Sequence, residues 1–305
     1  MSVFDRAVLP EVEFGAVPFW RQWLRGFSQC AFQANEVTAV FLILAVAVFS
    51  LQQAAFYLIA VLVGTAVAKL AKGVPDLLDL GLYGFNSGLF GLSMAAFFAP
   101  SPLLWVTVIV GAAVVALVTV AFSKLAPFPF LAAPFILTFW AFYPVAESVG
   151  LEKLVFDPFT DEKVFFVSAT FSAMGGALFA GTVISGLLFI IGVGLSNWRH
   201  AVVAFVCTLV AHIIATEWQT SAGAINAGLI GFNAVLCSIA VYSMCGQDLR
   251  LTLFGAIGAT ILIRLFNNLG LVPLAAGFVT MTWFIMLLGW LGPKFNGTPK
   301  EPEPA

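Results

Sequence analysis

Two pairs of phenylalanines recur along the chain at one spacing, inside apolar, glycine-containing segments. Phe85 lies in the run Gly-Leu-Tyr-Gly-Phe-Asn at 81–86, which returns 147 positions later as Gly-Leu-Ile-Gly-Phe-Asn at 228–233. Phe32 and Phe179 are separated by the same 147 positions. These side chains carry no titratable group, so they can select a solute by shape and polarity but cannot transfer protons. Two matches at one spacing predict two homologous halves, which in a membrane protein place a binding site or pathway at their interface near the bilayer midplane.

The titratable residues form no catalytic or metal-binding pattern. His200 follows Trp198 and Arg199 at a predicted membrane boundary, and His212 lies in an apolar run without a second ligand nearby. The cysteines lack CxxC or CxxH spacing and are expected to be buried free thiols; they are Cys30, Cys207, Cys237 and Cys245. No HExxH, GxSxG or paired intramembrane carboxylates occur. The sequence therefore predicts no cofactor, and a membrane-embedded enzyme is the least favoured function.

The composition predicts an integral membrane protein. Hydrophobic residues make up 61% of the 305 positions, charged residues only 9%, and the mean hydropathy is +1.05. A water-soluble globule carries about 25% charged residues, so this chain must be solvated by lipid. The net charge of −2 provides no basic stripe for nucleic acid. The segment before Phe19 lacks a continuous apolar core, so we expect no cleavable signal peptide.

The chain is expected to be all α-helical, but several of its apolar segments are shorter than the ~20 residues that span a bilayer. Segments 20–35 and 165–180 are interpreted as half-spanning helices, which are tolerated at membrane depth only when buried in protein or lining a cavity. The segments that open on the repeated Gly-Phe-Asn are expected to be interrupted in the same way. Asn86 and Asn233 are expected to bind backbone groups freed there. The apolar segments are 36–51, 54–71, 82–99, 103–122, 130–146, 165–180, 183–197, 200–216, 228–245, 250–266 and 271–291.

Charge and proline place the boundaries between the parts of the chain. We predict an N-terminal segment at 1–19, a first repeat at 20–146, a charged linker at 147–164, a second repeat at 165–291 and a disordered tail at 292–305. If each repeat holds five spans, the repeats are inverted and both termini lie on one side. Basic residues near the two ends favour the cytoplasm for that side; they are Arg21, Arg25, Lys294 and Lys300.

Several motifs together resemble the urea transporter family. They are the run from Leu24 to Gln33, the Gly-Leu-Tyr-Gly-Phe-Asn run at 81–86, Ala133-Pro134-Phe135 and the second Gly-Phe-Asn run at 228–233. The resemblance covers residues from about 20 to about 290. It implies ten membrane-spanning helices with two pairs of half-helices in inverted repeats, and a homotrimer in which each subunit has its own path. For a bacterial member it implies the inner membrane.

The resemblance also implies a narrow slot between apolar slabs, bordered by oxygen ligands for urea. The six slab positions, carried over by motif, are Phe32, Phe85, Leu89, Phe179, Phe232 and Leu236. Facing flat side chains admit a planar solute edge-on and strip its water, whereas a hydrated ion would lose its shell without replacement. In a chain with 32 phenylalanines, ordinary packing is the alternative for any one of them. The repeat and the motifs together favour a functional set.

The polar positions of the slot depart from the family pattern. The family usually has Gln or Glu at the second-half position that is equivalent to Gln29. Here that position is Gly176. The family also has Thr before the Pro-Phe of each half, and here these positions are Ala132 and Ala275. Ser172, one helical turn before Gly176, is a possible substitute. These changes favour a solute that is less polar or larger than urea, unless the alignment has slipped in the second half.

The expected function is a passive channel for a small neutral solute, urea or a urea-like amide. Ion coupling usually requires an intramembrane ionisable residue on the pathway. The candidates lie near predicted helix ends, and none occupies a slot position; they are Glu36, Lys69, His212, Glu217 and Arg264. An ion-coupled secondary transporter is the alternative, as is a channel for a less polar molecule than urea.

Overall fold

The computed structural model describes residues 17–126, 128–155, 159–218 and 220–296, and side chains as far as residue 290. Within these ranges every regular element is helical. The first half contains α2 (Phe19–Ser28), η1 (Gln29–Ala31), α3 (Glu36–Phe49), α4 (Leu51–Leu70), α5 (Pro75–Asp79), α6 (Gly84–Phe97), α7 (Pro102–Leu125), α8 (Ala133–Phe142) and η2 (Tyr143–Val145). The second contains α9 (Phe166–Gly176), α10 (Val183–Ser196), α11 (Trp198–Glu217), α12 (Ala222–Asn226), α13 (Phe232–Met244), α14 (Leu249–Asn268) and α15 (Ala276–Asn296).

The helices repeat at the spacing found in the sequence. Three pairs of helices are equivalent: α3 and α10, α4 and α11, and α5 and α12. In each pair the first residues lie 147 positions apart, and so do the last residues. After α14 the spacing shortens by four, because α14 ends four residues earlier than the repeat requires. Leu131 and Leu274, which are equivalent at this shorter spacing, share a left-handed backbone with φ of 48° and 45°. The shared backbone supports this register for the turns before α8 and α15, while the pairing of the slot positions stays a prediction.

Side-chain caps explain why equivalent helices begin where they do. Three pairs of equivalent positions each hold a residue whose side-chain oxygen accepts a backbone N–H in the first turn. These pairs are Asn35 with Thr182, Ser50 with Asn197, and Ser101 with Asp248. The residue types differ within each pair, so the caps preserve the helix starts even where the sequence repeat has faded.

Apolar side chains cover much of the outside of the molecule, as a membrane protein requires. Leu51, Leu70 and Leu125 are each about four-fifths exposed (79%, 82% and 83%). By length and composition, α4, α7, α11 and α14 can each cross a membrane. The bent pair formed by α2–η1 and α3, with an angle of 68°, makes a fifth candidate if it counts as one span. The other apolar helices are shorter, so length alone does not give the ten spans expected from the sequence.

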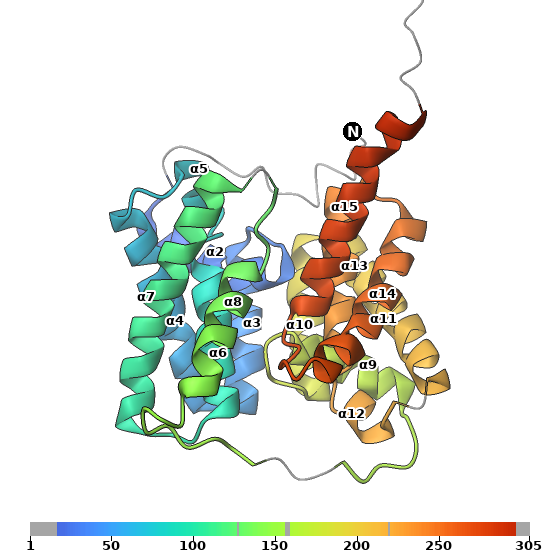
Figure 1. The fold of residues 1–305 in the computed structure, drawn as a ribbon, viewed down its shortest axis with the longest axis horizontal. Coiled ribbons are helices and arrows are strands. Elements are labelled where there is room, and N and C mark those ends of the chain that lie inside the picture. Colours follow the sequence, from blue (N-terminus) through green and yellow to red (C-terminus); the bar gives the residue numbers. More distant parts are fainter. Residues whose placement is uncertain (1–16, 127, 156–158, 219, 297–305) are drawn as a thin grey trace, which may run out of the picture.

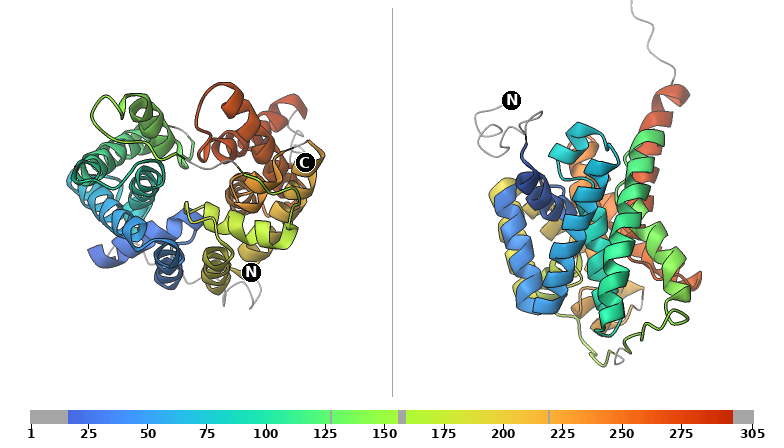
Figure 2. Two further views of the ribbon diagram at one scale, coloured as in Figure 1. Left: turned by 90° about the horizontal axis from the view of Figure 1, so that it is seen from below. Right: turned by 90° about the vertical axis from the view of Figure 1, so that its left-hand side faces the viewer.

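The two halves lie side by side, with their equivalent helices placed in opposite senses (Figures 1 and 2). In Figure 1, α5 lies at one end of the molecule and its equivalent α12 at the other. In each half one long helix packs on two others: α4 on α6 and α7, and α11 on α13 and α14. The halves meet along α3 and α10.

Two reciprocal hydrogen bonds join α3 to α10. Thr38 donates its hydroxyl to the Gly192 carbonyl at 2.8 Å, and Ser185 donates to the Ala45 carbonyl at 2.7 Å. The two donors occupy equivalent positions of the repeat, and so do the two acceptors. This exchange is what two copies of one fold make when a two-fold axis relates them.

Some described residues lie outside the two predicted repeats. α15 continues to Asn296, five residues into the segment 292–305 that was expected to be disordered. Residues 297–305 and 1–16 lie outside the described ranges. Lys153 forms an ion pair with Glu147 at 2.9 Å within the expected linker 147–164.

Candidate solute pathway

The ends of two short helices place Phe32 and Phe179. Phe32 directly follows η1 with φ of 58°, and Phe179 lies in the turn after α9 with φ of 56°. Both ends close through equivalent backbone bonds: the N–H of Phe32 to the Gln29 carbonyl at 3.0 Å, and the N–H of Phe179 to the Gly176 carbonyl at 2.9 Å. A left-handed backbone is unfavourable for a bulky residue, so its presence at both ends marks constrained positions.

Each of these phenylalanines contacts a phenylalanine of the other half. Phe32 meets Phe278 of the second half edge to face, with ring centroids 5.9 Å apart and planes at 86°. Phe179 meets Phe135 of the first half in the same way, at 6.4 Å and 85°. The two contacts are equivalent under the repeat. Phe32 and Phe179 therefore lie where the halves meet.

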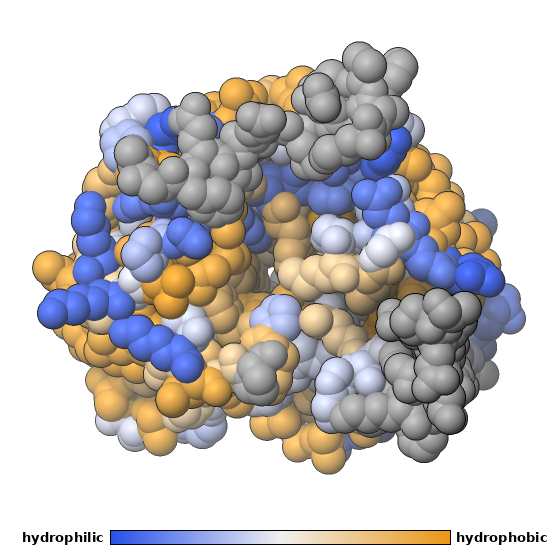
Figure 3. All heavy atoms as spheres, turned by 90° about the horizontal axis from the view of Figure 1, so that it is seen from above, coloured by the Kyte–Doolittle hydropathy of each residue, from blue (hydrophilic) through white to orange (hydrophobic). Residues whose placement is uncertain are grey.

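The remaining slab positions lie on α6 and α13. Phe85, Leu89 and Leu236 are buried, with exposed fractions of 6%, 4% and 4%, while Phe232 is half-buried. Phe85 stacks on Phe130 at 6.4 Å within its own half. All six slab residues belong to or pack on one apolar cluster that continues from one half into the other. Viewed from the end that carries α5, the surface is hollowed near its centre, between hydrophilic and apolar residues (Figure 3).

Asn86 and Asn233 bind backbone, as expected, but the groups they bind belong to distant turns and not to their own helices. Asn86 donates to the Leu131 carbonyl at 3.0 Å and accepts from the N–H of Phe135 at 3.2 Å. Asn233 donates to the Leu274 carbonyl at 2.9 Å and accepts from the N–H of Phe278 at 2.8 Å. Each asparagine thus holds the turn that leads into α8 or α15, together with the first turn of that helix.

Ala132 and Ala275 lie in these two turns and are almost fully buried, with exposed fractions of 1% and 4%. Ala132 is the N-cap of α8 and offers no side-chain oxygen to the helix. The N–H groups of Ala133, Phe135 and Ile136 in the first turn already donate to the Phe130 carbonyl, Asn86 and the Ala132 carbonyl. A threonine hydroxyl at position 132 would therefore not be taken up as a cap of this helix.

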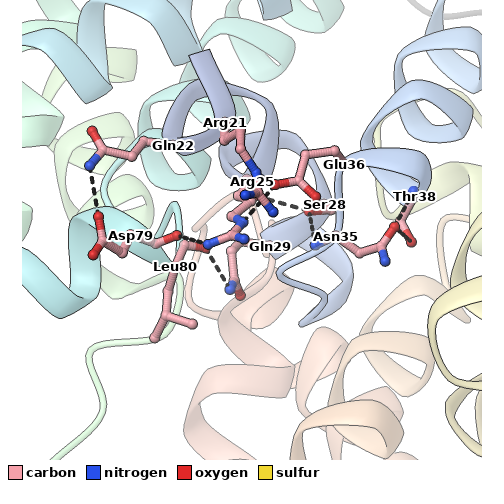
Figure 4. Close-up of polar contacts among 10 residues, drawn as sticks. All are labelled: Arg21, Gln22, Arg25, Ser28, Gln29, Asn35, Glu36, Thr38, Asp79 and Leu80. Carbon is pink, nitrogen blue, oxygen red and sulfur yellow. Dashed lines mark hydrogen bonds and ion pairs between the residues drawn. The ribbon is translucent and has the colours of Figure 1, made fainter. Parts of the chain in front are cut away.

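Gln29 is held by a network of polar side chains at the end of α2 (Figure 4). Its amide N–H donates to the Leu80 carbonyl at 2.8 Å, which leaves the side-chain oxygen without a hydrogen-bond partner among the described residues. Beside it, Arg25 donates to the Asp79 carbonyl at 2.6 Å and to the Glu36 carboxylate at 2.9 Å. The network thus fixes the amide with an acceptor oxygen to spare, which suits the N–H groups of an amide solute.

The second half replaces this network with close backbone packing. The positions equivalent to Arg25 and Gln29 are Ser172 and Gly176. A Cβ atom at Gly176 would lie 3.0 Å from the Gly228 carbonyl oxygen and 3.5 Å from the Cβ of Phe232. Ser172 is buried, and its hydroxyl has no hydrogen-bond partner among the residues described. The side chains at the two equivalent helix ends therefore differ in polarity.

Two tryptophans that sequence reasoning missed also join the halves. Trp140 donates its indole N–H to the Val272 carbonyl at 2.8 Å, and Trp283 donates to the Pro129 carbonyl at 2.8 Å. At the shorter spacing that follows α14, Trp140 is equivalent to Trp283 and Pro129 is equivalent to Val272. The two hydrogen bonds are therefore another reciprocal pair. The sequence shows that the two tryptophans are equivalent, but it does not identify the carbonyls that they bind. Among the described residues, no group of three or more His, Cys, Asp or Glu could hold a metal ion.

A comparison against protein families identifies the chain. The model of the family described as "Urea transporter" matches residues 20–289, which is most of the chain. The chain belongs to the urea transporter family. This confirms the resemblance seen in the sequence and makes the protein a member of a transporter family with several apolar, membrane-type helices. A search of curated proteins found no match.

Proposed function

We propose that this urea transporter family member is a passive channel for urea or a urea-like amide, with its pathway between the two halves. The observation that carries the proposal is the reciprocal contact of Phe32 with Phe278 and of Phe179 with Phe135. Together with Phe85, Leu89, Phe232 and Leu236 these rings would form a slot for a planar solute. A hydrated ion would be rejected because apolar side chains do not replace its water.

We further propose that the halves are inverted repeats, each with five spans, in a protein that crosses the membrane ten times. The reciprocal bonds imply a two-fold axis, and the positions of α5 and α12 at opposite ends favour an axis in the membrane plane. Helices shorter than a full span are compatible with this count where protein buries them. The proposal includes a homotrimer in the inner membrane of a bacterium, with both termini in the cytoplasm.

The proposed mechanism predicts flux that depends only on the solute gradient. Proteoliposomes containing the protein should swell in response to a urea or acetamide gradient faster than empty liposomes, measured by stopped-flow light scattering. Ionophores for protons and sodium should leave the initial rate unchanged, because none of the six slab side chains can bind or release an ion. An initial rate that collapses when either ion gradient is removed would instead establish an ion-coupled transporter.

The missing polar groups predict which neutral solute passes more easily. Urea needs partners for both of its amide groups, whereas the alkyl carbon of acetamide needs none, so we expect acetamide to permeate better than urea. The triple variant Gly176→Gln, Ala132→Thr and Ala275→Thr should raise urea flux relative to acetamide flux by up to about tenfold, if one net bond is recovered in the barrier. The backbone near Gly176 must yield slightly, because the new Cβ lies 3.0 Å from the Gly228 oxygen.

The control for this triple variant is the double variant Ala132→Thr and Ala275→Thr, which leaves the tightly packed Gly176 intact. Wild-type flux that favours urea, with no shift in either variant, would mean that backbone groups already bind the solute and that these three positions do not set selectivity.

A further inference from the structure

The carbonyl groups at the end of α9 are bound by a side chain from the other half. Gln53, on α4 of the first half, is 5% exposed. Its amide nitrogen donates to the Phe179 carbonyl at 3.0 Å and is 3.4 Å from the Leu178 carbonyl. Leu178 and Phe179 lie in the turn that follows α9, outside the hydrogen bonds of the helix, so this amide satisfies carbonyls that would otherwise be unpaired.

The equivalent position in the second half is His200, which acts through a second side chain. His200 lies on α11, is 7% exposed, and places its Nδ1 2.8 Å from the amide nitrogen of Gln33. The same amide nitrogen donates to the Ala31 carbonyl at 2.8 Å. The amide donates to both groups, so Nδ1 is the acceptor and the ring proton is assigned to Nε2.

Both arrangements act on the residues that hold a slot phenylalanine in a left-handed backbone. Phe179 itself accepts the bond from Gln53, and Ala31 directly precedes Phe32. Such a backbone persists in a bulky residue only when the surroundings enforce it. Gln53 and His200 each belong to the half opposite the phenylalanine concerned, so they fix the position of each ring relative to the half that faces it.

We propose that Gln53 and the His200–Gln33 pair are positioning residues that set the width of the slot. This inference rests on the proposed function. Gln53 binds the backbone of a slot phenylalanine directly, whereas His200 acts through Gln33 on the preceding residue. Gln53 therefore has the larger influence. Loss of Gln53 frees the Phe179 carbonyl to turn toward water and lets that ring move away from its partner. Loss of His200 leaves Gln33 bound to the Ala31 carbonyl but no longer held against the second half, so Phe32 is fixed less firmly.

The test compares solutes that differ in width. Urea and 1,3-dimethylurea flux is measured in proteoliposomes for wild type, Gln53→Leu and His200→Leu, each normalised to the monodisperse protein recovered. The ratio of dimethylurea flux to urea flux should rise about three- to tenfold in Gln53→Leu, and less in His200→Leu. His200→Gln, which installs the amide found at the equivalent position 53, should restore the wild-type ratio.

Two matched controls remove a buried hydroxyl from the same helices without touching the slot. Thr65 on α4 donates only to the Val61 carbonyl of its own helix, and Thr208 on α11 is fully buried. Thr65→Val and Thr208→Val should keep the wild-type ratio even if the protein yield falls.

The outcomes separate this inference from the proposed function. A wild-type protein that conducts both solutes, with an unchanged ratio in Gln53→Leu and His200→Leu, overturns the positioning role. If Gln53→Leu yields no folded protein, the comparison of His200→Leu with His200→Gln tests the positioning role: a raised ratio in the first and a wild-type ratio in the second support it, and equal ratios overturn it. A wild-type protein that conducts neither solute overturns the proposed function, and the inference with it.

Discussion

Phe179→Ala is expected to raise the flux of 1,3-dimethylurea relative to urea by about tenfold or more, the equivalent of about 1.4 kcal/mol in the barrier. Phe179 contacts Phe135 across the interface at 6.4 Å, and Phe97 at 6.5 Å. Its removal opens the slot on one side, so the wider solute no longer has to displace a ring. Phe179 is half-buried, and its loss should therefore destabilise the protein less than the loss of a fully buried phenylalanine.

The matched control for this variant is Phe171→Ala on α9, the helix that precedes Phe179. Phe171 is also half-buried and contacts Phe205 at 5.4 Å, within the second half alone. Phe171→Ala should leave the flux ratio unchanged. Stopped-flow light scattering of proteoliposomes measures the flux ratio of both variants. If Phe179→Ala lowers the yield of protein but keeps the ratio, Phe179 is a packing residue and does not line a pathway.

Arg25→Met is expected to lower the free energy of unfolding by about 3 kcal/mol. The Arg25 residue is 2% exposed, and its guanidinium binds the Glu36 carboxylate and the Asp79 carbonyl at 2.9 and 2.6 Å. Methionine fills most of the volume but donates to neither acceptor. The buried carbonyl of Asp79 loses this bond, and the end of α2 that carries Gln29 is no longer anchored.

Arg21→Met provides the comparison for Arg25, because Arg21 binds the same carboxylate oxygen at 2.7 Å from a more exposed position, with 29% of its side chain accessible. Its loss should cost less than about 1 kcal/mol, since solvent screens the pair. Thermal unfolding in detergent micelles measures both variants. Equal shifts for the two arginines would contradict the assignment of Arg25 as the anchor.

Local chemistry in the sequence predicted the helices well. The apolar runs 36–51 and 54–71 correspond to α3 and α4, although α4 begins three residues earlier, after its cap Ser50, which the apolar pattern alone does not mark. The repeat spacing predicted that Gly176 would stand opposite Gln29 in the alignment, and the matching φ angles of Phe32 and Phe179 support that register. Asn86 and Asn233 were correctly expected to bind backbone, but the groups bound lie in the turns before α8 and α15 and not in their own helices, which local sequence cannot reveal.

Contacts between the halves could not be predicted, because they depend on how the repeats face each other. Trp140 and Trp283 donate to carbonyls in the opposite half of the chain, and nothing near either tryptophan in the sequence identifies the acceptor. The same holds for Gln53 and Phe179. The number of spans is likewise not given by length, since α6 has 14 residues and α9 has 11, fewer than a full span needs.

The most direct test of the central claim is to locate a heavy-atom analogue of the solute in crystals of the protein. Selenourea keeps the planar shape and the amide groups of urea, and its selenium gives an anomalous signal. We predict a selenium peak between the halves, in contact with Phe32, Phe179 or the side-chain oxygen of Gln29. Selenium peaks found only on the lipid-facing surface, in a protein that conducts urea, would contradict a pathway between the two halves.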